Sequence, residues 1–171
     1  MASTPQTTAI ADAASAGLAS SGVVVDDITL NSAGRRKILR VFVARDLADL
    51  PHDDHTSLVD PLTLDEVADA TSMLNDALDE SGVMGEAPYT LEVSSVGVST
   101  PLTRREHFRR NVGRLVRIQE HDGPDQTSRL LAAAPQGIRL EASGDRWLAY
   151  EQISRATVQV EFNRATTGAQ N

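Results

Sequence analysis

Residues 52–55 read HDDH and bring two imidazoles and two carboxylates into four consecutive positions. These groups are ligands for divalent metal ions, and a protein-bound zinc ion can activate water for hydrolysis. The segment lacks helical spacing, and the chain has no cysteine to complete a ligand set. A metal-dependent hydrolase centred on His52 and His55 therefore stays open as an alternative, but we expect a solvated loop that holds no metal.

A second candidate for chemistry is the pair Ser94 and Ser95, which is followed by Gly97. A serine followed by a glycine two residues later resembles part of a nucleophile elbow. That turn also needs a glycine two residues before the serine. Glu92 and Val93 occupy those positions. We therefore expect no catalytic residue and no cofactor, and we expect the two hydroxyls to end a strand by bonding local backbone groups.

Arginines gather just after this stretch, with six in 14 residues: Arg104, Arg105, Arg109, Arg110, Arg114 and Arg117. Guanidinium groups match phosphate oxygens and carboxylates equally well, so the cluster suits contact with RNA or pairing with acidic residues of the same chain. Both interpretations remain open. Helical spacing places Arg105 and Arg109 on one side of a short helix and leaves Phe108 as its apolar anchor.

The charge of the chain is unevenly distributed. Residues 1–101 hold 16 acidic and 5 basic side chains, whereas residues 102–171 hold 8 acidic and 11 basic side chains, although the net charge is −8. Such asymmetry indicates a partner with both basic and anionic parts, or a solubilising domain beside a neutral one. The absence of cysteine, of a visible signal peptide and of a long apolar run predicts a cytoplasmic protein without a membrane partner.

Residues 9–101 are expected to form an α+β N-terminal domain with two helices on a three-stranded sheet, after a disordered segment at residues 1–8. Two β-rich runs around residues 23–45 are separated by a short turn and predict a hairpin. Thr63 and Glu66 have the spacing of a capping box and begin the second helix, which Gly82 can end. Gly82 and Gly85 also have the G-x-x-G spacing of a nucleic-acid clamp, but their acidic surroundings favour a helix end.

The remainder of the chain changes its pattern. Residues 102–112 are expected to be a connector with a short helix, and Thr103 and Glu106 repeat the capping-box spacing. Five short β-rich runs separated by turn residues then indicate a small all-β barrel over residues 113–163. Residues 164–171 are expected to be a flexible tail.

Residues 89–118, YTLEVSSVGVSTPLTRREHFRRNVGRLVRI, resemble the signature of the bacterial ribosome maturation factor RimP family. That signature commonly reads Y-x-L-E-V-S-S-P-G-x-x-R-P-L, followed by a phenylalanine, a basic residue and G-x-x-V. The matching motif residues include Glu92, Ser94, Ser95, Gly97, Pro101, Leu102, Phe108 and Gly113. The chain departs at Val96, where the family usually has proline, and at Ser99 and Thr100, where an arginine is missing.

The resemblance implies a non-enzymatic assembly factor that acts in maturation of the small (30S) ribosomal subunit. It also implies that the C-terminal domain is an SH3-like (Sm-like) barrel. The implied partners are the precursor of the small subunit, its rRNA and the twelfth small-subunit ribosomal protein, and we expect the chain to be a monomer. A general RNA-binding module or translational regulator is the alternative.

Overall fold

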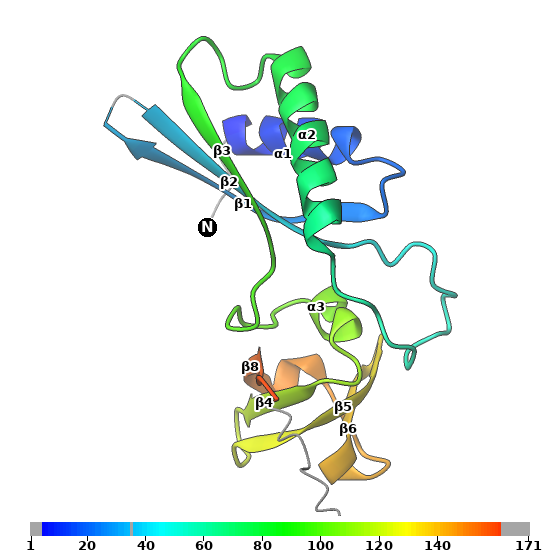
Figure 1. The fold of residues 1–171 in the computed structure, drawn as a ribbon. Helices are drawn as coiled ribbons and strands as arrows, with labels where there is room; N and C mark the ends of the chain where they lie inside the picture. Colours follow the sequence, from blue (N-terminus) through cyan, green and yellow to red (C-terminus); the bar gives the residue numbers. More distant parts are fainter. Residues whose placement is uncertain (1–4, 35, 162–171) are drawn as a thin grey trace, which may run out of the picture. The chain divides into compact units, whose positions relative to one another are not determined.

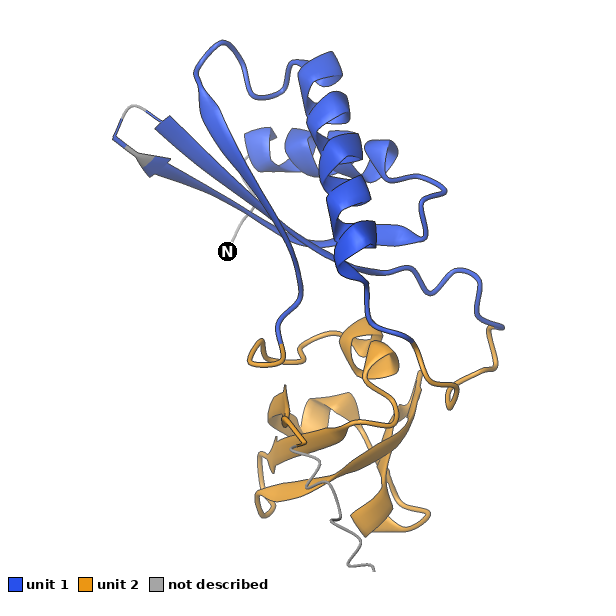
Figure 2. Cartoon of the chain, viewed as in Figure 1, with its two compact units in different colours: residues 1–51, 60–97 blue, residues 52–59, 98–171 orange. Residues whose placement is uncertain are grey.

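The computed structural model describes residues 5–34 and 36–161. The chain divides into two compact units, which Figure 2 shows in different colours. Unit 1 comprises residues 1–51 and 60–97, and unit 2 comprises residues 52–59 and 98–171. Unit 2 therefore contains a short segment that lies, in sequence, between two parts of unit 1.

Unit 1 is a three-stranded sheet with two helices (Figure 1). Its elements are α1 (Pro5–Gly17), β1 (Val23–Ala33), β2 (Arg36–Arg45), α2 (Leu64–Ser81) and β3 (Tyr89–Ser95). The strand order is β1-β2-β3. β1 pairs antiparallel with β2, as expected for a hairpin, and β3 pairs parallel with β2. The α+β architecture predicted from the sequence is confirmed.

The core of unit 1 follows from the alternation of apolar residues along β2. Leu39, Val41 and Val43 are fully buried and pack with Ile10 of α1 and Leu74 of α2 in one apolar cluster. Successive strand residues point to opposite faces, so these three side chains share the face that the helices cover. The helices and the central strand thus bury a common core, in which β-branched and aliphatic side chains replace aromatic rings.

Helix α2 begins and ends as its sequence predicts. The Thr63 hydroxyl accepts a hydrogen bond from the Glu66 N–H (3.2 Å), and the Glu66 carboxylate accepts one from the Thr63 N–H (2.8 Å). At the other end Gly82 adopts a left-handed conformation with φ 64°. The Gly85 N–H donates to the Gly82 carbonyl (3.0 Å), so the G-x-x-G spacing forms a helix end and a turn.

Helix α1 begins earlier than the sequence suggests. Residues 1–8 are expected to be disordered, but residues 5–8 belong to α1, while residues 1–4 lie outside the described residues. Proline is favourable in a first helical turn because its missing N–H would have no partner there. Ile10 and Ala14 are fully buried and attach the helix to the core.

Unit 2 is a five-stranded antiparallel sheet preceded by the short helix α3 (Arg105–Arg110). Its strands are β4 (Leu115–Glu120), β5 (Gln126–Ala134), β6 (Gly137–Leu140), β7 (Trp147–Leu148) and β8 (Ile153–Val158), and two 3-10 turns lie at Glu141–Ser143 and Tyr150–Gln152. All five predicted strands are present in the order β7-β6-β5-β4-β8. Within residues 5–34 and 36–161, β7 and β8 are unpaired with each other, so the sheet is not a closed ring of strand pairs.

Phe108 is the apolar anchor of α3, as predicted. Its side chain is 2% exposed, and its ring lies 5.4 Å from that of Tyr150 between centroids. The Tyr150 hydroxyl donates to the Ala134 carbonyl (2.9 Å), and burial raises the pKa of Tyr150 to about 12.

Residues 162–171, which contain the expected tail, lie outside the described residues. Among the residues described, no helix has the length and apolarity needed to cross a membrane.

Candidate functional site

The HDDH segment belongs to unit 2, where Asp54 organises a tight loop. Its carboxylate accepts hydrogen bonds from the N–H groups of Thr56 (3.0 Å) and Ser57 (2.9 Å) and from the Ser57 hydroxyl. The hydroxyl bond, followed by the two N–H bonds, lowers the pKa of Asp54 to about 2. Its carboxylate is therefore ionised and committed to the loop itself.

Arg109 fastens this loop to α3. Its side chain is 6% exposed; Nε donates to the Asp54 carbonyl (3.1 Å), and a terminal nitrogen donates to the Ser57 carbonyl (2.6 Å). The second terminal nitrogen lies 3.3 Å from Asp54 Oδ1. On β5, the Ala133 N–H donates to the His55 carbonyl (3.0 Å). The segment is thus held from two elements of unit 2, and the buried Arg109 pairs with an acidic residue of the same chain, which is one of the two interpretations that the sequence leaves open.

The contacts with Arg109 give Asp54 of the HDDH segment a structural role. Among the residues that the structure describes, no group of three or more histidine and carboxylate side chains is arranged to hold a metal ion. His52 is exposed and His55 is half-buried. The pairing of Asp54 with Arg109 leaves no trace in the sequence, because 54 residues separate the two and no local spacing relates them.

The serine pair lies at the exposed end of β3. Ser94 and Ser95 are opposite Phe42 and Val43 of β2. Within the described part of the chain neither hydroxyl makes a hydrogen bond, so the expected bonds to local backbone are not seen. The end of β3 is instead attached to β2 by a main-chain hydrogen bond, in which the Val96 N–H donates to the Val43 carbonyl (3.3 Å).

Other residues of the same motif join the chain to unit 2. Gly97 and Pro101 are exposed, whereas Leu102 is 6% exposed and its N–H donates to the Ala156 carbonyl of β8 (2.8 Å). Gly113 has φ 87°, its N–H donates to the Leu130 carbonyl (2.7 Å), and its own carbonyl accepts from Arg129 (2.6 Å). These contacts give Leu102 and Gly113 structural roles.

The start of α3 differs from the predicted capping box. His107 is 8% exposed, and its Nδ1 accepts a hydrogen bond from the Thr103 N–H (3.1 Å). The ring therefore takes the place that the sequence gives to Glu106. Arg104 precedes the helix, and its Nε lies 3.0 Å from Nε2 of the same ring.

The six candidate arginines do not form a single patch. Arg105 is exposed, Arg110 is half-buried and Arg109 is buried. Arg114 lines a small hollow with Val98, and Arg117 lines a different, polar one. Arg114 and Arg117 therefore line different hollows, which share Gln159 as a lining residue.

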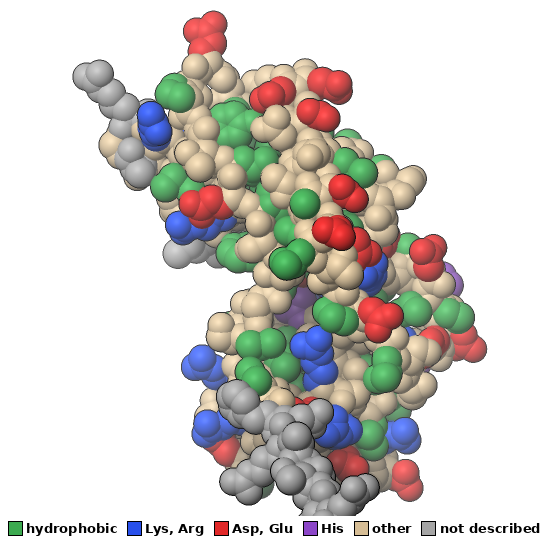
Figure 3. All heavy atoms as spheres, in the orientation of Figure 1, with side chains coloured by type: hydrophobic (Ala, Val, Ile, Leu, Met, Phe, Trp, Pro, Cys, Tyr) green, Lys and Arg blue, Asp and Glu red, His purple; other side chains and the backbone are tan. Residues whose placement is uncertain are grey.

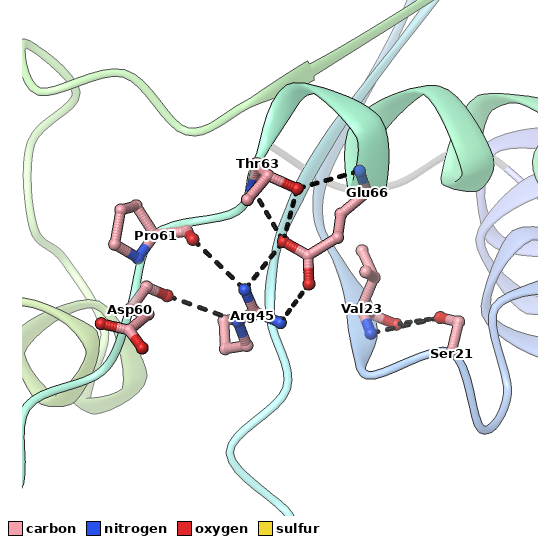
Figure 4. Close-up of polar contacts among 7 residues, drawn as sticks. All are labelled: Ser21, Val23, Arg45, Asp60, Pro61, Thr63 and Glu66. Atoms are coloured by element: carbon pink, nitrogen blue, oxygen red, sulfur yellow. Dashed lines mark hydrogen bonds and ion pairs between the residues drawn. The ribbon is translucent and has the colours of Figure 1, made fainter.

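The start of α2 carries a network that Figure 4 shows in close-up. The Arg45 guanidinium binds both oxygens of Glu66, at 2.6 Å and 2.9 Å, and also donates to the carbonyls of Asp60 and Pro61. Arg45, followed by the Thr63 N–H, lowers the pKa of Glu66 to about 2. The network holds the residues that precede α2 in place, so Arg45 and Glu66 have a structural role.

Comparisons with known proteins agree with the motif. The RimP N-terminal domain family model matches residues 14–99. The ribosome maturation factor RimP of Kineococcus radiotolerans is 39% identical over 157 residues, covering 83% of this chain and 71% of that protein. The chain belongs to the RimP family. The ribosome maturation factor RimP of Frankia casuarinae is 37% identical over 172 residues, covering 91% of this chain and 59% of that protein.

Two departures from the RimP signature can now be placed. Val96 stands where the family commonly has proline, and its N–H makes the bond to Val43 that a proline could not make. Ser99 and Thr100 are exposed, and Thr100 stands where the signature has arginine. The arginines nearest in sequence after this position are Arg104 and Arg105.

The RimP domain of unit 1 presents acidic residues along α2. Five of its carboxylate side chains are exposed: Asp65, Asp69, Asp76, Asp79 and Glu80. The helix contains no basic residue. Two apolar side chains of the same helix are also exposed, Leu64 (88%) and Met73 (42%). Figure 3 shows acidic side chains over unit 1 and several basic ones over unit 2. The charge asymmetry of the sequence is thus carried by surface residues.

Proposed function

We propose that this chain is a non-enzymatic assembly factor that acts in the cytoplasm, as a monomer, during maturation of the small (30S) ribosomal subunit. The observation that carries this proposal is the 39% identity to a ribosome maturation factor RimP over 83% of the chain. A binding function also fits the HDDH segment, because the Asp54 carboxylate is engaged in contacts within its own loop.

Two surfaces would meet the two kinds of partner. The exposed carboxylates of α2 suit a basic ribosomal protein, for which we propose the twelfth small-subunit protein. Arginines of unit 2 suit the phosphates of precursor rRNA, and Arg105 is the exposed member of the α3 set. The factor would occupy an immature surface, favour one arrangement of protein and rRNA, and leave when mature contacts replace its own.

We further propose that the domains follow the family pattern, with an SH3-like (Sm-like) domain after a connector at residues 102–112. The first half of β5 pairs with β4 and its second half pairs with β6, and the β5–β6 register shifts between Leu130 and Ala132. A shift of this kind bends a strand and lets one sheet curl around a core. Within the described part of unit 2, twelve buried residues between Leu102 and Val158 form that core.

Sedimentation of cell extract tests the function directly. The chain should migrate with precursors of the small subunit, and its deletion should slow growth and cause precursors to accumulate. A chain that never migrates with these particles would overturn the proposal. Equal affinity for free RNA and for precursor particles would instead favour a general RNA-binding module or translational regulator.

Binding to the purified twelfth ribosomal protein tests the acidic surface separately. Replacing Asp69 and Asp76 by asparagine should weaken binding roughly twofold to thirtyfold, since each exposed charge pair contributes about 0.2–1 kcal/mol. The matched control replaces Asp122 and Asp145, exposed carboxylates of unit 2, and removes the same net charge. Wild-type affinity should fall as salt rises. Salt-independent binding, or equal losses in both double variants, would contradict docking on α2.

A further inference from the structure

A polar surface on unit 2 is built from the outward-facing side chains of β4 and β8. Arg117 lies opposite Thr157, and Gln119 lies opposite Arg155, in the register of the two strands. With Gln159 these residues line a hollow of about 310 Å³. The alternate residues Val116, Ile118 and Ala156 are fully buried, so the five polar side chains share the solvent face. We call this set the β4–β8 polar face.

One anionic oxygen already occupies part of this face. Asp125 Oδ2 accepts hydrogen bonds from Arg117 (3.0 Å) and from the Gln119 amide (2.9 Å). These two bonds, that of Gln119 first, lower the pKa of Asp125. The donors of the face therefore converge on an oxygen that carries negative charge, which is also the geometry that a phosphate oxygen requires.

The second guanidinium of the face is not engaged in this way. Arg155 is exposed and makes no ion pair with any residue in the described ranges. Arg155 lies on β8 and Arg117 lies on β4, and of these two arginines Asp125 pairs with Arg117 in the part of the chain that the structure describes. An incoming anion would therefore find one unpaired arginine and one that Asp125 can release.

We infer that the β4–β8 polar face binds the sugar-phosphate backbone of an RNA strand. The inference rests on the proposed function and adds a location and a ligand chemistry to it. The guanidinium groups of arginine match phosphate oxygens. The Thr157 hydroxyl and the two glutamine amides can each donate and accept hydrogen bonds, which suits contact with a ribose 2′-hydroxyl. An acidic protein segment would use only the donors.

The composition of the β4–β8 polar face predicts that it does not recognise the base sequence of the RNA. None of its five residues is aromatic, so the face lacks the aromatic platform on which sequence-reading RNA-binding modules stack bases. Contacts to phosphate and sugar position a strand without specifying its sequence. The face should therefore bind RNA of different sequences with similar affinity, and Asp125 should act as a competitor that limits this affinity.

Fluorescence anisotropy of the full chain with a labelled single-stranded RNA of about ten nucleotides, repeated at several salt concentrations, tests the inference. Arg155→Ala should weaken binding roughly threefold to tenfold and reduce the slope of log K against log salt by about 1. Asp125→Asn should strengthen binding, because it removes the competing charge. Arg146→Ala is the matched control: Arg146 is an exposed arginine of unit 2 that does not line the hollow.

Circular dichroism and thermal unfolding of each variant establish that it is folded. Equal losses in Arg155→Ala and Arg146→Ala would show a response to net charge alone and overturn the inference, as would a weaker complex with Asp125→Asn. Stronger competition by a polyglutamate peptide than by unlabelled RNA would identify an acidic protein as the ligand and would also overturn it. If Arg155→Ala lowers RNA affinity while wild-type chain never migrates with ribosomal precursors, the site stands and the proposed function fails.

Discussion

Arg109 shows how a buried contact can change the meaning of a charged residue. It belongs to an arginine-rich stretch that suggests a basic surface, yet its guanidinium is directed into unit 2 and holds the carbonyls of Asp54 and Ser57. A buried guanidinium needs such acceptors, because an unpaired buried charge is strongly unfavourable. The basic surface of the helix is therefore smaller than the number of arginines suggests.

Replacing Arg109 by alanine should lower the free energy of unfolding by about 1–3 kcal/mol, because hydrogen bonds to a charged group and the docking of the loop are lost. Chemical denaturation measures the change, and limited proteolysis should cut residues 52–59 faster. Arg105→Ala is the control, since Arg105 is exposed on the same helix and its loss should change stability by less than about 0.5 kcal/mol. Equal effects of the two substitutions would contradict the fastening role.

Gly113→Ala should destabilise the chain by about 1–3 kcal/mol for two reasons that can be separated. The backbone has φ 87°, which side-chain-bearing residues rarely adopt, and an added Cβ would clash with Leu58 Cδ2. Leu58 is 72% exposed and can move or be shortened at little cost. If conformational strain dominates, adding Leu58→Ala should leave most of the loss in place in denaturant unfolding. Full recovery in the double variant would assign the loss to the clash.

At the scale of elements, α2 depends on a network at its beginning. The Glu66 carboxylate forms the capping box with Thr63 and also accepts hydrogen bonds from both terminal nitrogens of Arg45. One carboxylate therefore connects the start of α2 to the end of β2. A negative charge in the first turn is also favoured by the helix dipole. The order of the segment before α2 and the stability of the helix are therefore coupled through Glu66.

This coupling predicts a dependence of stability on pH. The folded pKa of Glu66, about 2, lies below its ordinary value of 4.5, so the unfolded chain takes up the proton first. The stabilising contribution of Glu66 is complete above pH 4.5 and is lost as pH falls toward 2. Glu66→Gln should unfold with a shallower dependence on pH in this window. A slope identical to that of wild type would exclude Glu66 as a contributor, and Asp54 would account for the remaining slope.

Thr63→Ala removes the other half of the capping box. We expect a loss of about 1 kcal/mol in the free energy of unfolding, because the Glu66 N–H loses its side-chain acceptor. Thr63→Ser is the control that retains the hydroxyl and should unfold close to wild type in denaturant. A comparable loss in both variants would indicate that the Thr63 methyl group, rather than the cap, is responsible.

At the scale of the molecule, the chain contributes to its two units in an interleaved order. Residues 52–59 belong to unit 2, although residues on both sides of them belong to unit 1. The segment supplies the partners of Arg109 and a carbonyl for Ala133 of β5. Unit 2 is therefore incomplete when it is taken only from the C-terminal part of the chain.

A fragment that starts at Val98 should show the effect of this missing segment. It lacks the acceptors of Arg109, so we expect it to melt roughly 5–15 °C below the same unit in the full chain, by thermal circular dichroism. The full chain with Arg109→Ala should fall between the two. A fragment as stable as the intact unit would show that the segment adds nothing to its stability.

The local patterns determined the elements of both units. Alternation of apolar residues identified β2 and its partners, the T-x-x-E spacing located the start of α2, and turn residues separated the five strands of unit 2. These features depend on neighbours within a few residues, which is why they are visible in one dimension. The motif from Tyr89 to Gly113 likewise identified the family without a structure.

Contacts between distant residues were decided only by the tertiary structure. Arg109 meets Asp54 across 54 intervening residues, His107 replaces Glu106 at the start of α3, and Arg155 joins Arg117 on one face because β8 pairs with β4. Strand pairing and burial determine such meetings, and no spacing along the chain encodes them. The sequence therefore determined which residues could bind an anion, and the packing of unit 2 decided which of them face solvent and which hold the fold.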